Sequence, residues 1–168
     1  MSRKGKPAHS THAVWEIQAL RGRVEELEAR CNPKLIGDDE VYADLTAYLV
    51  IRISGYLEQS VRIILVEYCD KYSHKMANSF VNSHLSRMPN LNASALINLI
   101  QKFDVSISSD LERMISEDER RGRLNALVSI RNNLAHGLSS SVSPRQAAEY
   151  RILVEEIIDW LLVKFHPN

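Results

Sequence analysis

Three side chains late in the chain have the types and the spacing that chemistry on a phosphate requires. Arg131, Asn132 and His136 lie in the segment IRNNLAHG, residues 130–137. His136 follows Asn132 by four positions, so the two side chains lie on one side of the same helical turn. Near neutral pH an imidazole can accept or donate a proton, and a guanidinium presents a fork of donors that suits a phosphate. The segment therefore predicts a site for a phosphate-bearing substrate at the end of a helix.

These groups suffice for cleavage of RNA without a metal ion. The ribose 2′-hydroxyl would lose its proton, attack the adjacent phosphorus and leave a cyclic phosphate. That reaction requires a base, an acid and a cation, because RNA itself brings the nucleophile. Asn132 can orient the imidazole ring or bind a phosphate oxygen. We therefore predict Arg131, Asn132 and His136 as catalytic residues.

The element that positions these residues is predicted as one long helix beginning at Ser109. Its apolar face recurs at three- and four-residue steps, through Leu111, Met114, Ile115, Leu124, Leu127, Val128 and Leu134. Arg131 follows Val128 by three positions and so falls on that apolar face. The run SDLE at 109–112 is read as a capping box, and Gly137 can end the helix in a left-handed conformation.

The rest of the chain reads as further helices without strand alternation or repeats, so we predict an all-α, up-and-down bundle of about five to six helices. A long helix over 40–68 is its backbone, on the order of 40 Å in length. Arg52 and Glu58 lie close to the apolar stripe of this helix, so each is expected to need a partner. The other predicted helices cover 73–87, 93–103 with Asn92 as cap, and a last helix that opens with the capping box SPRQ at 143–146.

The N-terminal part divides into two segments. Residues 1–10 are polar and basic and are predicted to form a disordered tail. Residues 11–31 form a helix with a short heptad seam, which is too short for a solitary coiled coil. This helix must either dock on the domain at 38–168 or pair with a copy of itself, and we favour docking.

Arg-x4-His at a helix end, with Asn after the Arg and Gly after the His, resembles the signature of the HEPN superfamily. The likeness is to the RiboL-PSP-HEPN-like group. The segments SGYLEQS at 54–60 and NLN at 90–92 also resemble that group. The resemblance covers residues 38–138, and the last helix fits less distinctively.

This resemblance implies a symmetric homodimer in which two Arg-x4-His motifs face each other and act on RNA. It also suggests an acidic or polar residue on the long helix that supports the arginine, for which Glu58 is our candidate. By the same likeness, the protein would be a toxin or anti-phage defence effector, and an antitoxin or regulatory protein is a further candidate partner. No cofactor is implied.

Simpler interpretations stand beside these. Arg131 could be a bundle arginine paired with a carboxylate, and His136 could be a helix-terminal residue placed against the helix dipole. Glu58 fits a structural role better than a catalytic one. The basic run of Arg120, Arg121 and Arg123 could bind flanking RNA phosphates, but a charged run is more often a solvated face. Whole-protein alternatives are a non-catalytic HEPN-like module that binds nucleotide, RNA or protein, and a plain dimerisation domain.

Composition limits the other possibilities. Lys plus Arg and Asp plus Glu both count 21, so any RNA contact must come from a local basic patch. No segment reaches the roughly 18 apolar residues of a membrane span, and no signal-peptide core is seen at the start. The two cysteines, Cys31 and Cys69, lack a metal or redox spacing and fit a reduced cytoplasm. No metal site is predicted, since the histidines have no suitable partners.

Overall fold

The computed structural model describes residues 12–73, 75–86, 88, 90–138 and 141–166, and all regular structure among them is helical. This confirms the predicted all-α class. The helices are α1 (His12–Arg30), α2 (Pro33–Ile36), α3 (Asp39–Tyr72), α4 (Lys75–Leu85), α5 (Ala93–Gln101), α6 (Val105–Ser116), α7 (Arg120–Ala135) and α8 (Pro144–Phe165). Within the described part, no helix is both long and apolar enough to cross a membrane. The predicted tail at 1–10 lies outside the described residues.

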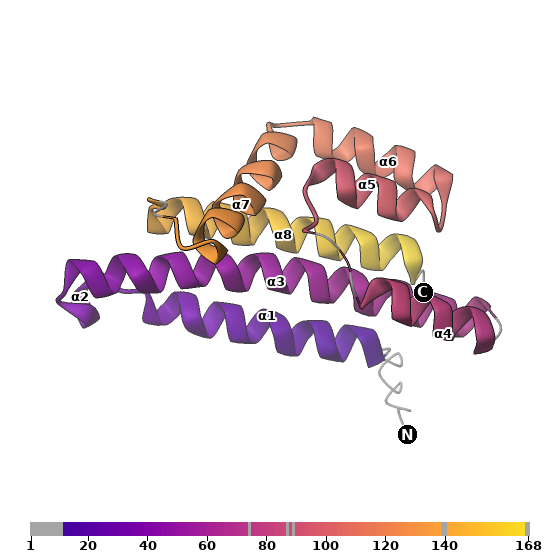
Figure 1. Ribbon diagram of the computed structural model, residues 1–168, viewed down its shortest axis with the longest axis horizontal. Helices are drawn as coiled ribbons and strands as arrows, with labels where there is room; N and C mark the ends of the chain where they lie inside the picture. The colour runs from indigo at the N-terminus through magenta and orange to yellow at the C-terminus, as the bar shows by residue number, and fades with distance from the viewer. Residues whose placement is uncertain (1–11, 74, 87, 89, 139–140, 167–168) are drawn as a thin grey trace, which may run out of the picture.

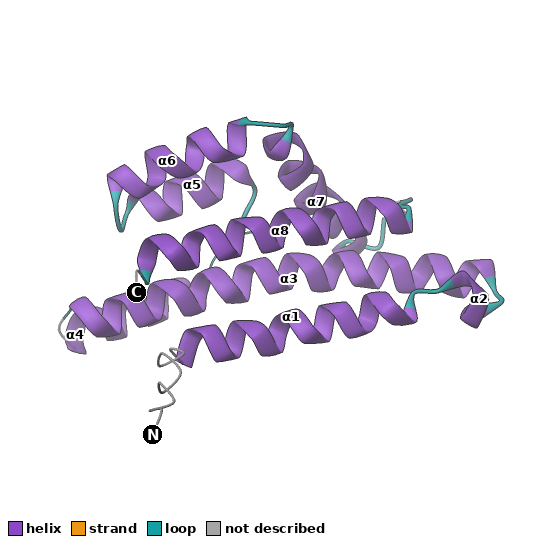
Figure 2. Cartoon of the chain, turned by 180° about the vertical axis from the view of Figure 1, so that it is seen from behind, coloured by secondary structure: helices purple, strands orange, loops and turns teal. Residues whose placement is uncertain are grey.

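The long helix α3 is the centre of the fold. Helices α1 and α8 run along it on either side, and α7 also packs against it (Figures 1 and 2). Helices α5 and α6 form a hairpin beside α8, and α7 leads from that hairpin back to α3 (Figure 1). The 34 residues of α3 thus give α1, α4, α7 and α8 a common surface, while α5 and α6 pack on each other and on α7.

Helix α1 lies along α3 through an apolar face and a polar anchor. Ile17 and Val24 are fully buried in this position. The guanidinium of Arg21 donates from Nε to the hydroxyl of Tyr56 and also forms an ion pair with Asp159 of α8. The anchor therefore joins α1 to both of its neighbours.

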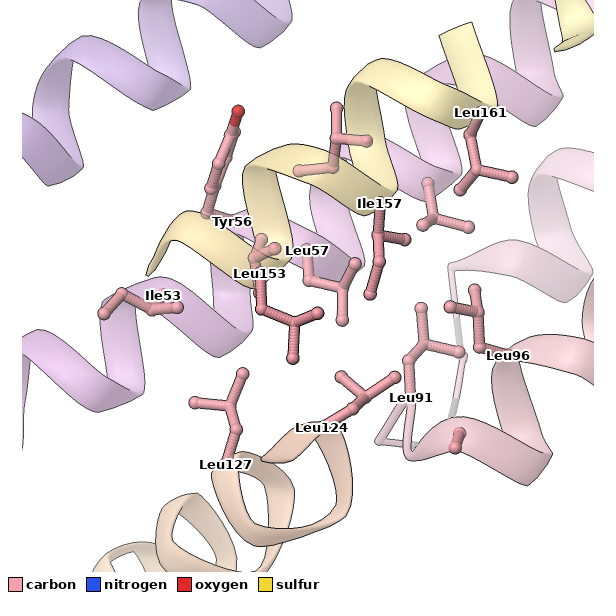
Figure 3. Close-up of a cluster of buried hydrophobic side chains, with 14 of the residues drawn as sticks. Ile53, Tyr56, Leu57, Leu91, Leu96, Leu124, Leu127, Leu153, Ile157 and Leu161 are labelled. Atoms are coloured by element: carbon pink, nitrogen blue, oxygen red, sulfur yellow. The ribbon is translucent and has the colours of Figure 1, made fainter. Parts of the chain in front are cut away.

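The core is built where α3, α7 and α8 meet. Figure 3 shows Leu124 and Leu127 pointing from α7 towards Leu57 of α3 and Leu153 of α8. All four side chains are buried, and truncation of such a residue to alanine costs about 2–5 kcal/mol. This apolar packing fixes both the position and the rotation of α7.

Side-chain caps mark several helix starts, and those at Asn92 and at 143–146 were predicted. Asp38 caps α3 by accepting hydrogen bonds from the backbone of Glu40 and Val41. Asn92 caps α5 by accepting from Ala95 N. The capping box at 143–146 is formed in full, with proline in the first turn of α8.

The predicted single helix from Ser109 to the motif is wrong. Helix α6 begins earlier, where the side chain of Asp104 accepts from Ile107 N, and Ser109 lies inside it, donating to Val105 O. The helix then stops at Ser116, and the chain turns through Asp118 and Glu119, whose φ angles are 49° and 60°. Two successive left-handed residues cannot continue a right-handed helix, so the motif belongs to a separate helix, α7.

Candidate active site

The packing of α7 presents Arg131 to α3. Leu127 and Val128 are buried on the inner face of α7, and Arg131 follows them by four and three positions on the same face. Its side chain is half-buried and lines a small pocket together with residues of α1 and α3. The sequence-based placement of Arg131 on the apolar face thus matches its position.

Asn132 is held by two donors. Its Oδ1 accepts a hydrogen bond from Nη1 of Arg131 at 3.3 Å and another from Nδ2 of Asn90. Asn90 lies in the linker between α4 and α5, so the contact fixes the Asn132 amide from outside its own helix. Among the described residues the Nδ2 group of Asn132 makes no hydrogen bond, so it can donate to a ligand.

A second bond ties the first residue of α5, directly after this linker, to α7. The side-chain oxygen of Asn125 accepts from the backbone of Ala93 at 3.0 Å, and the intervening Leu91 is buried. Sequence reasoning did not identify Asn90 or Asn125 as site residues. The available signals were the NLN segment at 90–92 and the seven-residue spacing from Asn125 to Asn132, which places both amides on one helix face.

Glu58 lies close enough to Arg131 for the two charges to interact. Burial raises the pKa of Glu58, and the positive charge of Arg131 and the hydroxyl of Ser54 oppose that rise. No ion pair joins Glu58 to Arg131 among the described residues, and Glu58 Oε1 is buried without a hydrogen-bond partner there. The carboxyl group is therefore a neighbour of the arginine and not its direct partner.

His136 follows the last turn of α7 and is exposed. Its backbone N–H donates to Asn132 O, and Gly137, with a φ of 72°, closes the helix as its sequence position predicted. In the described part of the chain, the imidazole makes no hydrogen bond or ion pair. Its ring is accordingly free to meet a substrate or a second copy of the protein.

The three predicted RNA-binding arginines lie at the other end of α7, roughly 12–16 Å along the helix from Arg131. Arg120 pairs with Glu117, Asp118 and Glu156, and Arg121 pairs with Glu112. Arg123 is exposed. The structure does not bring these arginines together with Arg131, Asn132 and His136.

The pocket beside Arg131 has a volume of roughly 160 Å³ and is lined by α1, α3 and α7. Larger hollows of about 510 and 590 Å³ lie between α4 and α5 and between α1 and α3, away from the motif. Among the described residues, no three His, Cys, Asp or Glu side chains form a group that could hold a metal ion.

Comparison with known proteins identifies the family. The RiboL-PSP-HEPN family model matches residues 18–161. The chain belongs to the RiboL-PSP-HEPN family. The match begins inside α1 and ends near the end of α8, so it spans the whole arrangement around α3. No curated protein and no solved structure matches the chain.

Membership of the HEPN superfamily indicates a nuclease or another RNA-related module. The geometry is compatible with either, because it combines a cation, an oriented amide and an exposed imidazole at one helix end. One chain supplies one imidazole to this site, whereas cleavage of RNA through the 2′-hydroxyl needs both a base and an acid.

Proposed function

We propose that the protein is a metal-independent endoribonuclease that acts as a symmetric homodimer. The observation that carries this proposal is the linked pair of Arg131 and Asn132, with exposed His136 one turn further along α7. A second copy would add a second imidazole, so that one could act as base and the other as acid. The product would be a cyclic phosphate.

Each residue has a role in this mechanism. One His136 takes the proton from the ribose 2′-hydroxyl, and the partner's His136 gives a proton to the departing 5′-oxygen. Arg131 stabilises the charge that develops on the pentacovalent phosphorus species, and Asn132 donates to a phosphate oxygen. Glu58 is a positioning residue, since its charge acts on Arg131 from inside the bundle.

The state of Arg131 supports a ligand-binding role. A structural arginine in a bundle is usually paired with a carboxylate. Within the described residues Arg131 forms no ion pair, and its hydrogen bond goes to the neutral amide of Asn132. A guanidinium left half-buried with a neutral partner retains donors for a phosphate.

The test is digestion of RNA in the presence of EDTA, with the oligomeric state measured on the same sample. Wild-type protein is expected to be a dimer that leaves cyclic phosphate ends. His136→Ala should lower kcat by about 10²–10⁴-fold, as removal of a general acid–base does. His12→Ala, which removes another exposed imidazole on α1, is the matched control. Intact RNA after incubation with verified wild-type dimer would overturn the proposal.

A non-catalytic RNA- or nucleotide-binding module is the second candidate, favoured by the single imidazole that each chain provides. In that case Arg131→Ala would weaken the complex, whereas His136→Gln would have little effect because it keeps a donor. Under the nuclease proposal, His136→Gln abolishes cleavage because an amide cannot carry the proton.

The biological role that we propose is that of a cytoplasmic toxin or anti-phage effector, held in check by an antitoxin or regulatory protein. This part of the proposal is supported by family likeness alone. Expression of the wild type should arrest bacterial growth, and expression of His136→Ala to the same level should not. Normal growth with active wild-type enzyme would contradict the role without affecting the nuclease proposal.

A further inference from the structure

The small pocket between α1, α3 and α7 is lined by two arginines. Arg52 and Arg131 both line it, together with the amide of Gln59. Arg52 and Gln59 are seven positions apart, so they lie on one face of α3, roughly 10 Å apart along its axis. Among the described residues, no carboxylate lines this pocket. The charged side chains that line it are therefore both cationic.

Arg52 was expected to need a partner, because it lies close to the apolar stripe of α3. Within the described residues, it makes neither an ion pair nor a hydrogen bond, although it is half-buried. Arg131 beside it donates a hydrogen bond to the neutral Asn132, and the Glu58 carboxyl interacts with it by charge without forming an ion pair among the described residues. Two positive charges that face one pocket repel each other, and an anion placed between them removes that cost.

Gly55 also lines the pocket, between the positions of Arg52 and Gln59 on α3. A Cβ built at Gly55 would meet no atom within 4 Å. Glycine inside a helix costs about 1 kcal/mol relative to alanine, so helix stability does not account for this residue. Any longer side chain at position 55 would extend into open space beside the two arginines.

We propose that this pocket binds one backbone phosphate of the RNA strand, next to the phosphate that is cleaved, between Arg52 and Arg131. The inference rests on the proposed function and deepens it by adding Arg52 and Gln59 to the substrate contacts. Arginine presents paired donors that match phosphate oxygens. The pocket, at roughly 160 Å³, is smaller than the ~300–1,000 Å³ of sites that enclose a whole small ligand, which favours a single phosphate over a free nucleotide.

The first experiment measures RNA binding by full-length His136→Ala protein, so that the strand stays intact. Arg52→Gln in this background should weaken binding about tenfold and lower the slope of log affinity against log salt by about 0.7, the value for one phosphate of a single strand. Arg62→Gln is the matched control, since Arg62 is an exposed arginine on the same helix and lies outside this pocket. If both variants lost the same RNA affinity, the loss would be explained by the change in net charge alone, and the inference would be overturned.

A second pair of variants tests whether the empty volume of the pocket is needed for RNA binding, and neither variant removes a charge. Gly55→Met should weaken RNA binding by filling the pocket, whereas Gly22→Met, where a Cβ also meets nothing within 4 Å, should not. Melting temperatures establish that both variants are folded. Unchanged affinity in folded Gly55→Met would contradict the inference.

Kinetics and competition separate this inference from the proposed function. In the wild-type background, Arg52→Gln should raise KM more than it lowers kcat, since it removes a contact to a phosphate that does not react. A fall in kcat alone would instead place Arg52 at the reacting group and overturn the inference. A mononucleotide that competes as tightly as the RNA would indicate a nucleotide site and also overturn it. If the wild type binds RNA through Arg52 but cuts nothing, the nuclease proposal fails and the phosphate pocket stands.

Discussion

Asn90 donates a side-chain hydrogen bond to Oδ1 of Asn132, although 42 positions separate the two residues in the chain. The same oxygen accepts from Arg131. The linker between α4 and α5 thus orients the Asn132 amide of α7. Because Arg131 donates to the same oxygen, the linker also helps to position Arg131. Orientation of this kind matters for catalysis, because a misplacement of about 1 Å can cost 10²-fold in rate.

Removal of this contact should affect activity more than stability. Asn90→Ala is expected to lower the free energy of unfolding by about 1 kcal/mol, the usual worth of one hydrogen bond, and to lower kcat about tenfold. Asn125→Ala is the control, because it releases the start of α5 at Ala93, next to the same linker, without touching Asn132. Denaturant unfolding and RNA digestion measure the two effects. Equal activity losses in both variants would show that linker attachment matters, and not the orientation of Asn132.

The buried carboxyl of Glu58 should make stability depend on pH. Since burial raises its pKa, the folded chain retains this proton to higher pH than the unfolded chain. The free energy of unfolding therefore falls as pH rises from 4.5, the ordinary pKa of this group, through its raised pKa in the folded chain. Above the raised pKa, the contribution of Glu58 to stability no longer changes with pH. Glu58→Gln, which does not titrate, should gain in denaturation midpoint relative to wild type between pH 4 and pH 7. A difference that is the same at both pH values would refute this, and exposed Glu25→Gln serves as the reference.

Helix α1 should stabilise a single chain through one of its faces. Ile17 is fully buried against the bundle, so Ile17→Ala is expected to cost about 2–5 kcal/mol of unfolding free energy. Trp15 is 67% exposed, so Trp15→Ala should change stability by less than about 0.5 kcal/mol. Chemical denaturation at several protein concentrations distinguishes these effects from pairing of α1 between copies. A concentration-dependent loss in Ile17→Ala would favour pairing.

The turn between α6 and α7 holds a residue whose backbone suits glycine. Glu119 has a φ of 60° and caps α7 without a side-chain hydrogen bond. Glu119→Gly is expected to stabilise the fold by up to about 1 kcal/mol, because it relieves a left-handed conformation. Glu117, with a φ of −81°, provides the comparison, and its replacement by glycine should destabilise. Thermal unfolding measures both, and a loss in both variants would argue against strain at Glu119.

The parts of the fold that were predictable are those set by local chemistry. The capping box at 143–146 and the cap at Asn92 depend on residues within three positions of each other, so the sequence displays them directly. The break after Ser116 was missed because it contains no glycine or proline. Its acidic residues read equally well as the solvated face of a continuing helix, and apolar periodicity on both sides concealed the turn.

The candidate site was predictable only in part for a related reason. The positions of Arg131 and Asn132 follow from helical spacing within one element. The role of Asn90 does not, because it depends on a contact over 42 positions that no local pattern encodes. The pocket at Arg52 likewise requires three helices to meet, so the sequence indicated an arginine that needs a partner without indicating what lies opposite it.

The two ties from the linker to α7, at Asn132 and at Asn125, have a mechanical consequence. Because these two hydrogen bonds join the segment from Asn90 to Ala93 to the second half of α7, a displacement of that segment would disturb the orientation of Asn132. A protein that binds in the hollow between α4 and α5 would contact this linker, and its effect would be passed to Asn132 without direct contact. Inhibition from that hollow would therefore act by displacing Asn132 and not by covering the site.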